Sequence, residues 1–321
     1  MFTRRQTFSL IAGAAAVLAL PTTGRAQGAA KEFRIGWQKG GAFALAKASG
    51  AIEQRLAPLG VSVSWAEFTS GPPLLEALGA NALDFGSTGD VPPLFAQAAG
   101  GDLVYVAATP GSLNGSAILV KQTSPIQTLA DLKGKKVAFK RGSSSHNFIV
   151  KALRSVDLSL DDIDQLDLGP ADAAPAFANS QIDAWVIWDP YYAIAAQDPD
   201  TRVLTTTEGI VDSWSFLQAN GAFARDNPEI VAAVIDELIK VGTAAQANLD
   251  QTAEQISAST GVPVPITRIT LGRKGADLGG IVPLDEEILT YQQALADEFY
   301  GLKIIPRQLT IRDIAWYAPK A

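Results

Sequence analysis

The stretch ALDFGSTGDVPPLFAQAAGGDLVYVA, residues 82–107, contains one complete unit of alternating secondary structure. Residues 82–86 predict a short strand, residues 92–99 a helix that opens on prolines, and residues 103–107 a second strand. The polar loop GSTGD separates the first strand from the helix. Because two strands joined by a helix run parallel in one sheet, the stretch predicts an α/β fold.

The same alternation continues on both sides of this unit, with an interruption at the turn-rich stretch TPGSLNGS, residues 109–116. Apolar periodicity predicts strands at 33–37, 61–65, 165–168 and 184–188, and helices at 72–80, 147–156 and 171–179. After residue 227 the pattern is mostly helical, and it includes a helix over 285–299. We therefore expect two α/β lobes, each a mostly parallel sheet flanked by helices, joined by two hinge crossings near 114–116 and 219–221. The first lobe is expected to contain residues 27–114 and 219–321, and the second residues 115–218.

The N-terminus has the pattern of an export signal. Arg4 and Arg5 precede an Ala/Leu-rich segment over residues 10–20, and small residues follow around Ala26. This segment is shorter than the roughly 20 residues that span a bilayer. Residues 1–26 therefore predict a cleaved signal peptide of the twin-arginine type, and a periplasmic product.

Composition limits the function classes. Removal of residues 1–26 leaves 23 basic and 33 acidic side chains, a net charge of −10, which disfavours nucleic acid as a partner. The chain has no cysteine and a single histidine, His146, so a zinc site is nearly excluded. No phosphate-binding glycine loop of a nucleotide enzyme is found, and no second long apolar segment predicts a membrane span.

Five polar loops lie where predicted strands run into helices: WQKGG (37–41), FTSGP (68–72), GSTGD (86–90), RGSSSHN (141–147) and WDPYY (188–192). In open α/β sheets ligands bind at the carboxyl ends of strands, and helix N-termini attract anions. We expect these loops to converge on a small anion. Taken one at a time they have simpler explanations, since serines and aspartates such as Asp90 and Asp189 commonly cap helices, and Trp37 and Trp188 could belong to a core.

The loop GSSSHN allows three interpretations: a nucleophile with its base, an anion-binding loop, or a helix cap. A serine hydrolase needs a base delivered from elsewhere in the fold, whereas His146 lies only two residues from Ser144. No G-x-S-x-G elbow is found either. The serines are therefore interpreted as ligand donors.

The motifs GWQKG, EFTSGPPLLEAL, DFGSTGDVPPLFAQAAG, DLVYVA, DLKGKKVAFKRGSSSHN and DAWVIWDPYY resemble those of the aliphatic-sulfonate-binding proteins of ABC importers. That family is similar to the type II periplasmic binding proteins and has nitrate-, taurine- and thiamine-precursor-binding relatives. The resemblance covers most of the mature chain and weakens after residue 200. It implies a monomer without cofactor or metal that delivers a sulfonate anion to an inner-membrane permease and its ATPase.

The resemblance also implies a set of ligand-binding residues: Gln38, Ser87, Thr88, Gly89, Asp90, Ser144, Ser145, His146, Trp188 and Asp189. Trp37 and Trp214 are expected in a pocket for the ligand tail. Because a carboxylate would repel a sulfonate, we expect Asp90 and Asp189 to face away from the anion or to meet an amino group on the tail. Taurine, nitrate or a pyrimidine remain alternative ligands, and an exported enzyme that uses Ser144 and His146 is the remaining alternative class.

Overall fold

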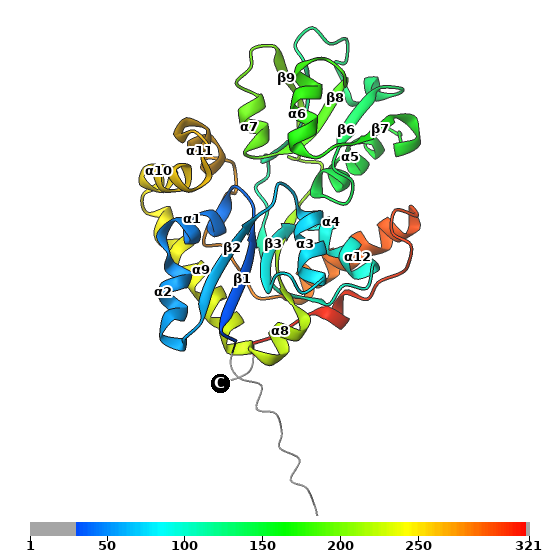
Figure 1. The fold of residues 1–321 in the computed structure, drawn as a ribbon. Helices are drawn as coiled ribbons and strands as arrows, with labels where there is room; N and C mark the ends of the chain where they lie inside the picture. Colours follow the sequence, from blue (N-terminus) through cyan, green and yellow to red (C-terminus); the bar gives the residue numbers. More distant parts are fainter. Residues whose placement is uncertain (1–29, 319–321) are drawn as a thin grey trace, which may run out of the picture.

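The computed structural model describes residues 30–318, which form two lobes stacked one above the other (Figure 1). The predicted signal peptide lies outside the described residues. The first lobe is built on a five-stranded sheet in the order β2-β1-β3-β10-β4. Its strands are β1 (Glu32–Trp37), β2 (Ser62–Glu67), β3 (Phe85–Gly89), β4 (Leu103–Pro110) and β10 (Trp214–Asn220). Its helices are α1 (Gly41–Ser49), α2 (Ala51–Leu56), α3 (Gly71–Gly79), α4 (Val91–Ala98), α8 (Gly221–Asp226), α9 (Pro228–Gln246) and α12 (Glu286–Gly301).

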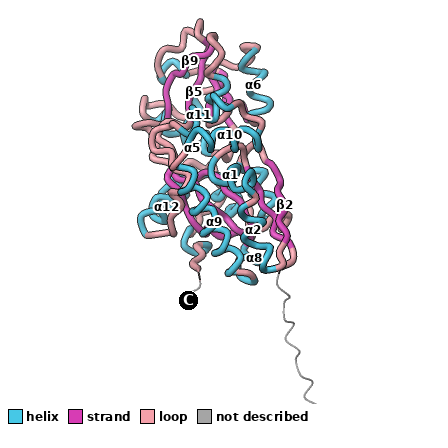
Figure 2. The backbone as a smooth tube through the Cα atoms, turned by 90° about the vertical axis from the view of Figure 1, so that its left-hand side faces the viewer, coloured by secondary structure: helices cyan, strands magenta, loops and turns pink. Residues whose placement is uncertain are grey.

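The second lobe is built on a sheet in the order β7-β6-β8-β5-β9. Its strands are β5 (Ser116–Lys121), β6 (Lys136–Phe139), β7 (Asp164–Asp167), β8 (Ala184–Trp188) and β9 (Thr201–Thr206), and its helices are α5 (Ser144–Arg154), α6 (Pro170–Ala178) and α7 (Tyr191–Ala195). Two further helices, α10 (Leu249–Thr260) and α11 (Val264–Leu271), lie at the level where the lobes meet in both views (Figure 2).

Both sheets are mostly parallel, as expected, with one reversed strand each. In the first sheet β10 runs antiparallel to its neighbours β3 and β4, and in the second β5 runs antiparallel to β8 and β9. Each reversed strand is the first one that the chain forms after it arrives from the other lobe. The remaining strands point their carboxyl ends toward the junction of the lobes, where a ligand site is expected.

Successive apolar residues of a strand point to opposite faces of the sheet, so they build a core on each face of both sheets. In β10, Phe216 packs with α4 and α12, whereas the next residue, Leu217, packs on the opposite face with α1, α2 and α9. In the second lobe, Ile118 and Val120 of β5 face α5, whereas Leu119 faces α6. The two-sided cover explains why these strands are continuous apolar runs in the sequence.

Two links join the lobes: residues 111–115 between β4 and β5, and residues 207–213 between β9 and β10. They lie side by side, since the Gly111 N–H donates to the Ser213 carbonyl at 2.8 Å. A Cβ on Gly111 would overlap the Ser213 backbone and hydroxyl, so the close approach requires glycine there.

The expected return crossing near 219–221 is wrong, and the expected boundary between residues 218 and 219 would divide β10. All of β10 belongs to the first sheet, so the chain returns before Trp214. The change of sequence character near residue 220 marks a strand-to-helix junction at the base of the first lobe. The strand was not recognised because it is mostly buried and has no helix before it.

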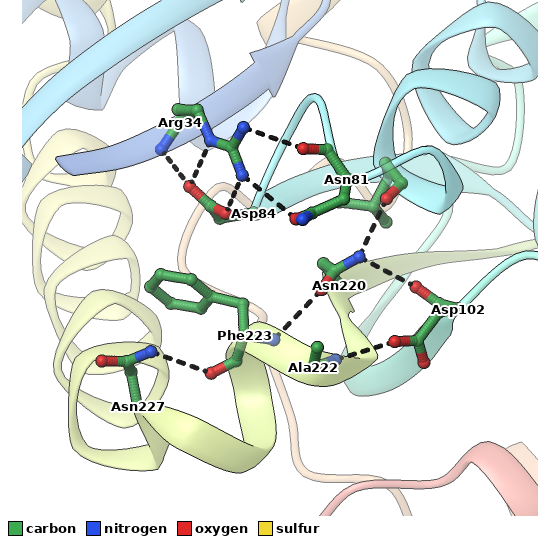
Figure 3. Close-up of polar contacts among 9 residues, drawn as sticks. Arg34, Asn81, Asp84, Asp102, Asn220, Ala222, Phe223 and Asn227 are labelled. Atoms are coloured by element: carbon green, nitrogen blue, oxygen red, sulfur yellow. Dashed lines mark hydrogen bonds and ion pairs between the residues drawn. The ribbon is translucent and has the colours of Figure 1, made fainter. Parts of the chain in front are cut away.

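Polar contacts close the base of the first lobe, at the end of the sheet away from the second lobe (Figure 3). The Arg34 guanidinium donates to both carboxylate oxygens of the buried Asp84, at 2.9 and 2.6 Å. Asn220 caps α8 by accepting from the Phe223 N–H at 3.0 Å and donates to the carbonyl of Asp102 at 3.2 Å. These contacts tie the amino ends of the parallel strands together and leave the carboxyl ends for the site.

Within residues 30–318, no helix is long and apolar enough to cross a membrane. The same residues contain no group of three or more His, Cys, Asp or Glu side chains arranged to hold a metal ion.

Candidate functional site

A cavity of ≈ 380 Å³ lies between the lobes, and all five polar loops contribute to its wall. The helix starts at α1, α3 and α5 therefore present the positive ends of their backbone dipoles to one shared cavity. Nine of the expected site residues line it: Trp37, Gln38, Ser87, Thr88, Gly89, Ser144, Trp188, Asp189 and Trp214. Asp90, Ser145 and His146 do not.

The first lobe presents a polar edge at the end of β3. The Ser87 hydroxyl donates to the Phe216 carbonyl at 3.0 Å, and the Gln38 amide donates to the Ser87 carbonyl at 3.2 Å. The Thr88 hydroxyl accepts from Gln218 Nε2 at 3.1 Å. Hydrogen bonds among β1, β3 and β10 thus fix the positions of these side chains before a ligand arrives.

The second lobe presents the first turn of α5. Ser143 caps this helix, because its hydroxyl accepts from the Ser145 N–H at 3.2 Å, so one serine of the loop has the simpler role of a helix cap. Ser144 faces the cavity and touches the first lobe. A Cβ on Gly89 would collide with the Ser144 hydroxyl, so the lobes approach each other this closely only because residue 89 is glycine.

His146 points away from the cavity, which corrects the expectation that it binds the ligand. Its ring packs among Phe95, Phe139 and Phe299, and its Nδ1 accepts from the Gly142 N–H at 3.3 Å. Burial, together with the positive charge of Arg141, lowers the pKa of His146 to about 4, so the ring is neutral at ordinary pH. It therefore provides neither a base for Ser144 nor a positive charge for an anion. Ser145 is likewise buried, with a hydroxyl that has no partner among the described residues.

Asp90 also points away from the cavity, but it is not the side-chain cap of α4 that we expected. Its Oδ2 accepts from the Tyr291 hydroxyl at 2.7 Å and, across the lobes, from Asn147 Nδ2 at 2.8 Å. Burial raises the pKa of Asp90, and the hydrogen bonds from Tyr291 and Asn147 oppose this increase. The carboxyl group therefore joins α4, α5 and α12 behind the site.

Asp189 lines the cavity and has partners on both lobes. Its Oδ1 accepts from the Ala193 N–H of α7 at 3.1 Å, and Arg273 donates to both of its oxygens, at 2.7 and 3.1 Å. Burial raises the pKa of Asp189, and Arg273 opposes the increase. The expected helix-capping contact of Asp189 is present, but the residue does not face away from the site.

An aromatic wall completes the cavity and is formed by Trp37, Phe43, Trp188, Tyr191 and Trp214. Trp188 meets Tyr191 edge to face, with ring centroids 6.3 Å apart. Lys47 lies 5.1 Å from the ring centroid of Trp37 on the side of α1. Large flat side chains of this kind suit an apolar ligand tail.

One segment of the lining could not be predicted from the sequence: the end of α11 and the loop that follows it. Its cavity residues are Thr270, Leu271, Ala276, Asp277, Leu278 and Ile281. The stretch LGRKGADLGG, residues 271–280, carries an obvious turn signal in its glycines. A turn signal shows that a helix ends, but not that the following loop reaches a site formed by much earlier parts of the chain.

Comparisons with known proteins agree with this architecture. A family model described as NMT1/THI5 like matches residues 59–251. A protein of Escherichia coli K12 named as an aliphatic sulfonates-binding protein is 39% identical over 292 residues, which cover 91% of this chain and 90% of that protein. The taurine-binding periplasmic protein of the same organism is 27% identical over 262 residues, 74% of this chain and 78% of its own length.

Among solved structures, the alkanesulfonate-binding protein of Xanthomonas axonopodis pv. citri bound to MOPS superposes with a TM-score of 0.83 at 36% identity, covering 89% of this chain and 98% of the other. These relatives are solute-binding proteins, and this chain is a binding protein and not an enzyme. The interpretation of Ser144 and His146 as a catalytic pair is thereby set aside. The chain belongs to the NMT1/THI5-like family, as a relative of the aliphatic sulfonate-binding proteins with the fold of a type II periplasmic binding protein.

Proposed function

We propose that the protein captures aliphatic sulfonates between its lobes and delivers them to an ABC importer. The observation that supports this most strongly is the mixed lining of the cavity, which combines hydroxyl, amide and helix-end groups with aromatic rings. A sulfonate is a monoanion at physiological pH, with three acceptor oxygens and no proton to donate. A site rich in donors, next to an apolar wall, suits both ends of such a ligand.

The charges of the lining residues favour a monoanion over a dianion. Lys39 pairs with Glu67 at 3.6 Å, and Asp189 is paired with Arg273. The remaining attraction for an anion comes from hydrogen-bond donors and from helix ends, each equivalent to about half a charge. Hydrogen bonds to a charged group contribute about 1.5–3 kcal/mol each, so a few of them reach the roughly −8 kcal/mol of a micromolar complex after ordering costs.

Taurine is a second candidate because one lining carboxylate lacks a cationic partner among the described contacts. Asp277 Oδ1 accepts from the Gly279 N–H at 2.9 Å and from Gln246 Nε2 at 3.1 Å, and neither donor is charged. An ammonium group on the ligand tail would pair with this exposed carboxylate. The similarity to a taurine-binding protein is consistent with this candidate.

The proposed location is the periplasm, after cleavage of residues 1–26. The support is the twin-arginine sequence at the N-terminus and the periplasmic location of the taurine-binding relative. N-terminal sequencing of the periplasmic fraction should begin at Gln27. Replacement of Arg4 and Arg5 by lysine should retain the precursor in the cytoplasm, and unchanged export would contradict the twin-arginine route.

The function is tested by calorimetric titration of the refolded, ligand-stripped mature chain with linear alkanesulfonates, MOPS, taurine, nitrate, sulfate and a pyrimidine. The proposal requires one-to-one binding of alkanesulfonates, with nitrate and sulfate at least about tenfold weaker. Tightest binding of taurine would favour the second candidate. Binding of nitrate or the pyrimidine alone would contradict both.

A further inference from the structure

Arg273 belongs to an arm, α10 to residue 281, that is anchored on the first lobe. Ile256 of α10 is part of the first-lobe core, and the Ser259 hydroxyl donates to the Ala44 carbonyl of α1 at 3.2 Å. At the other end of the arm, the Leu278 carbonyl lies so close to Gly242 of α9 that a Cβ there would overlap it. The arm is therefore attached to the first lobe at both ends, and between them Val262 and Ile266 pack on Ala193 of α7 in the second lobe.

From this anchored arm Arg273 crosses to the second lobe. Its guanidinium holds Asp189 with two parallel hydrogen bonds and lies over the ring of Tyr192, 4.1 Å from the ring centroid. Both side chains of the pair are nearly buried, at 13% and 14% exposure. A planar guanidinium can donate two parallel hydrogen bonds to a carboxylate and stack on an aromatic ring at the same time, which a lysine ammonium cannot do.

The position of Asp189 in the cavity wall gives the pair a role in ligand choice. An ionised carboxylate in a partly enclosed site repels an anion, and that repulsion is strong where water is excluded. Asp189 belongs to the second lobe and Arg273 to the arm attached to the first, so a separation of the lobes at this point would part the two charges. An anion entering the open cleft would meet a bare carboxylate, and the closed cleft would present a neutral pair.

We propose that Arg273 is a specificity residue of the proposed sulfonate site, which neutralises Asp189 on closure and so lets the closed cavity accept an anionic ligand. The inference rests on the proposed function and adds to it a residue and a selection rule. Ligands are then distinguished by net charge: the affinity for a plain alkanesulfonate depends on Arg273, whereas the affinity for a zwitterion such as taurine depends on it much less.

The test compares the wild type with Arg273→Gln, Arg273→Lys, Asp189→Asn and the double variant Arg273→Gln/Asp189→Asn, using calorimetry with a butanesulfonate and with taurine. Arg273→Gln should weaken butanesulfonate binding at least about 30-fold, because a buried carboxylate loses its partner, and taurine binding by less. Arg273→Lys should fall between wild type and Arg273→Gln. The double variant should recover most of the butanesulfonate affinity.

Lys274→Gln is the matched control. Lys274 lies on the same arm and pairs with Glu208 of the second link, and neither residue lines the cavity. It should change both affinities by less than about threefold, as expected for an exposed pair. Thermal unfolding of each variant identifies any that fails to fold, and the double variant keeps the test valid if Arg273→Gln is unstable.

Equal losses for both ligands in Arg273→Gln, without recovery in the double variant, would overturn the inference and reduce Arg273 to a closure contact while the sulfonate function stands. If the wild type binds no sulfonate, the proposed function fails, and the same comparison is then made with the anion of the panel that does bind. Binding of no anion by the wild type would overturn both.

Discussion

Two of the polar contacts between the lobes are built in opposite ways. Behind the site, α5 of the second lobe meets α12 of the first, where Lys151 and Arg154 pair with Glu298, and Asn147 donates to Asp90. Beside the site, the arm of the first lobe supplies the cation, and the second lobe supplies Asp189. Neither Glu298 nor its two partners line the cavity, whereas Asp189 of the Arg273 pair does.

This difference indicates that one contact stabilises the closed arrangement of the lobes and that the other determines ligand selectivity. The pairs of Glu298 are half-exposed on the second-lobe side, so they should stabilise closure for any ligand and depend on salt. The Arg273 pair is nearly buried and close to the ligand, so it should act on ligand charge. Mutations can therefore affect closure and selectivity separately.

The largest expected effect comes from preventing both contacts at once. Gly89→Ala places a methyl group against the Ser144 hydroxyl and should hold the lobes apart. We expect sulfonate affinity to fall about 100-fold, equivalent to about 2.7 kcal/mol, with little change in thermal stability. Gly169→Ala, which points into open space, is the control for the added methyl group. Wild-type affinity in Gly89→Ala would show that closure is looser than the structure implies.

The next prediction concerns His146, in the aromatic pocket behind the site, and the dependence of the protein's stability on pH. Because the native pKa of His146 is about 4 and its ordinary value is 6.5, the unfolded chain takes up the proton first as pH falls. The contribution of the neutral ring to stability is thus complete above pH 6.5 and is lost progressively between 6.5 and 4, by about 3 kcal/mol. His146→Phe should remove this part of the pH dependence in urea unfolding at pH 7.5 and 4.5. Parallel pH profiles for the two proteins would contradict the assignment.

The contribution of Asp90 to the pH dependence of stability should have the opposite sign to that of His146. Burial raises its native pKa, so the folded chain holds the proton more tightly than the unfolded chain. The ionised form lowers stability above the raised pKa, and the loss is relieved as pH falls through that value. Asp90→Asn should therefore be more stable than wild type at pH 8, by about 1 kcal/mol, with a smaller difference at pH 5. A stability difference that does not change with pH would mean that Asp90 keeps its charge.

The smallest effect tests closure alone. Glu298→Gln removes the acceptor of both cations on α5, and we expect affinity to fall about fivefold at low salt and less at 1 M salt, similarly for butanesulfonate and taurine. Glu286→Gln, which breaks an exposed pair with Arg312 inside the first lobe, is the control and should not change affinity. A loss confined to one ligand would place selectivity in the α5–α12 contact as well.

Most of the strands and helices followed from periodicity, and the convergence of five loops followed from the rule that ligands bind at strand ends. The prediction was less accurate inside a single loop. In GSSSHN, Ser143 caps the helix, Ser144 faces the cavity, and Ser145 and His146 are buried. Successive residues of a helix point about 100° apart, so neighbours in sequence cannot all face one ligand.

The C-terminal arm could not be placed from sequence for a different reason. Arg273 acts through Asp189, 84 residues earlier, and the pairing depends on how α11 packs against α7. Its glycine-rich surroundings indicate a turn only. Local patterns specify an element, whereas a contact between distant elements depends on the packing of everything between them.

The position of β10 has a consequence for the order of folding. Residues 116–206 supply every strand of the second sheet, so that lobe can form as soon as they are synthesised. The first sheet needs β10 between β3 and β4, and β10 emerges only after the second lobe is complete. Until then β3 and β4 expose unpaired edges, which are prone to aggregation. The N-terminal half of the first lobe therefore cannot complete its sheet until β10 has been synthesised. A chaperone or an export receptor that recognises incomplete sheets would bind this lobe for longer than the second.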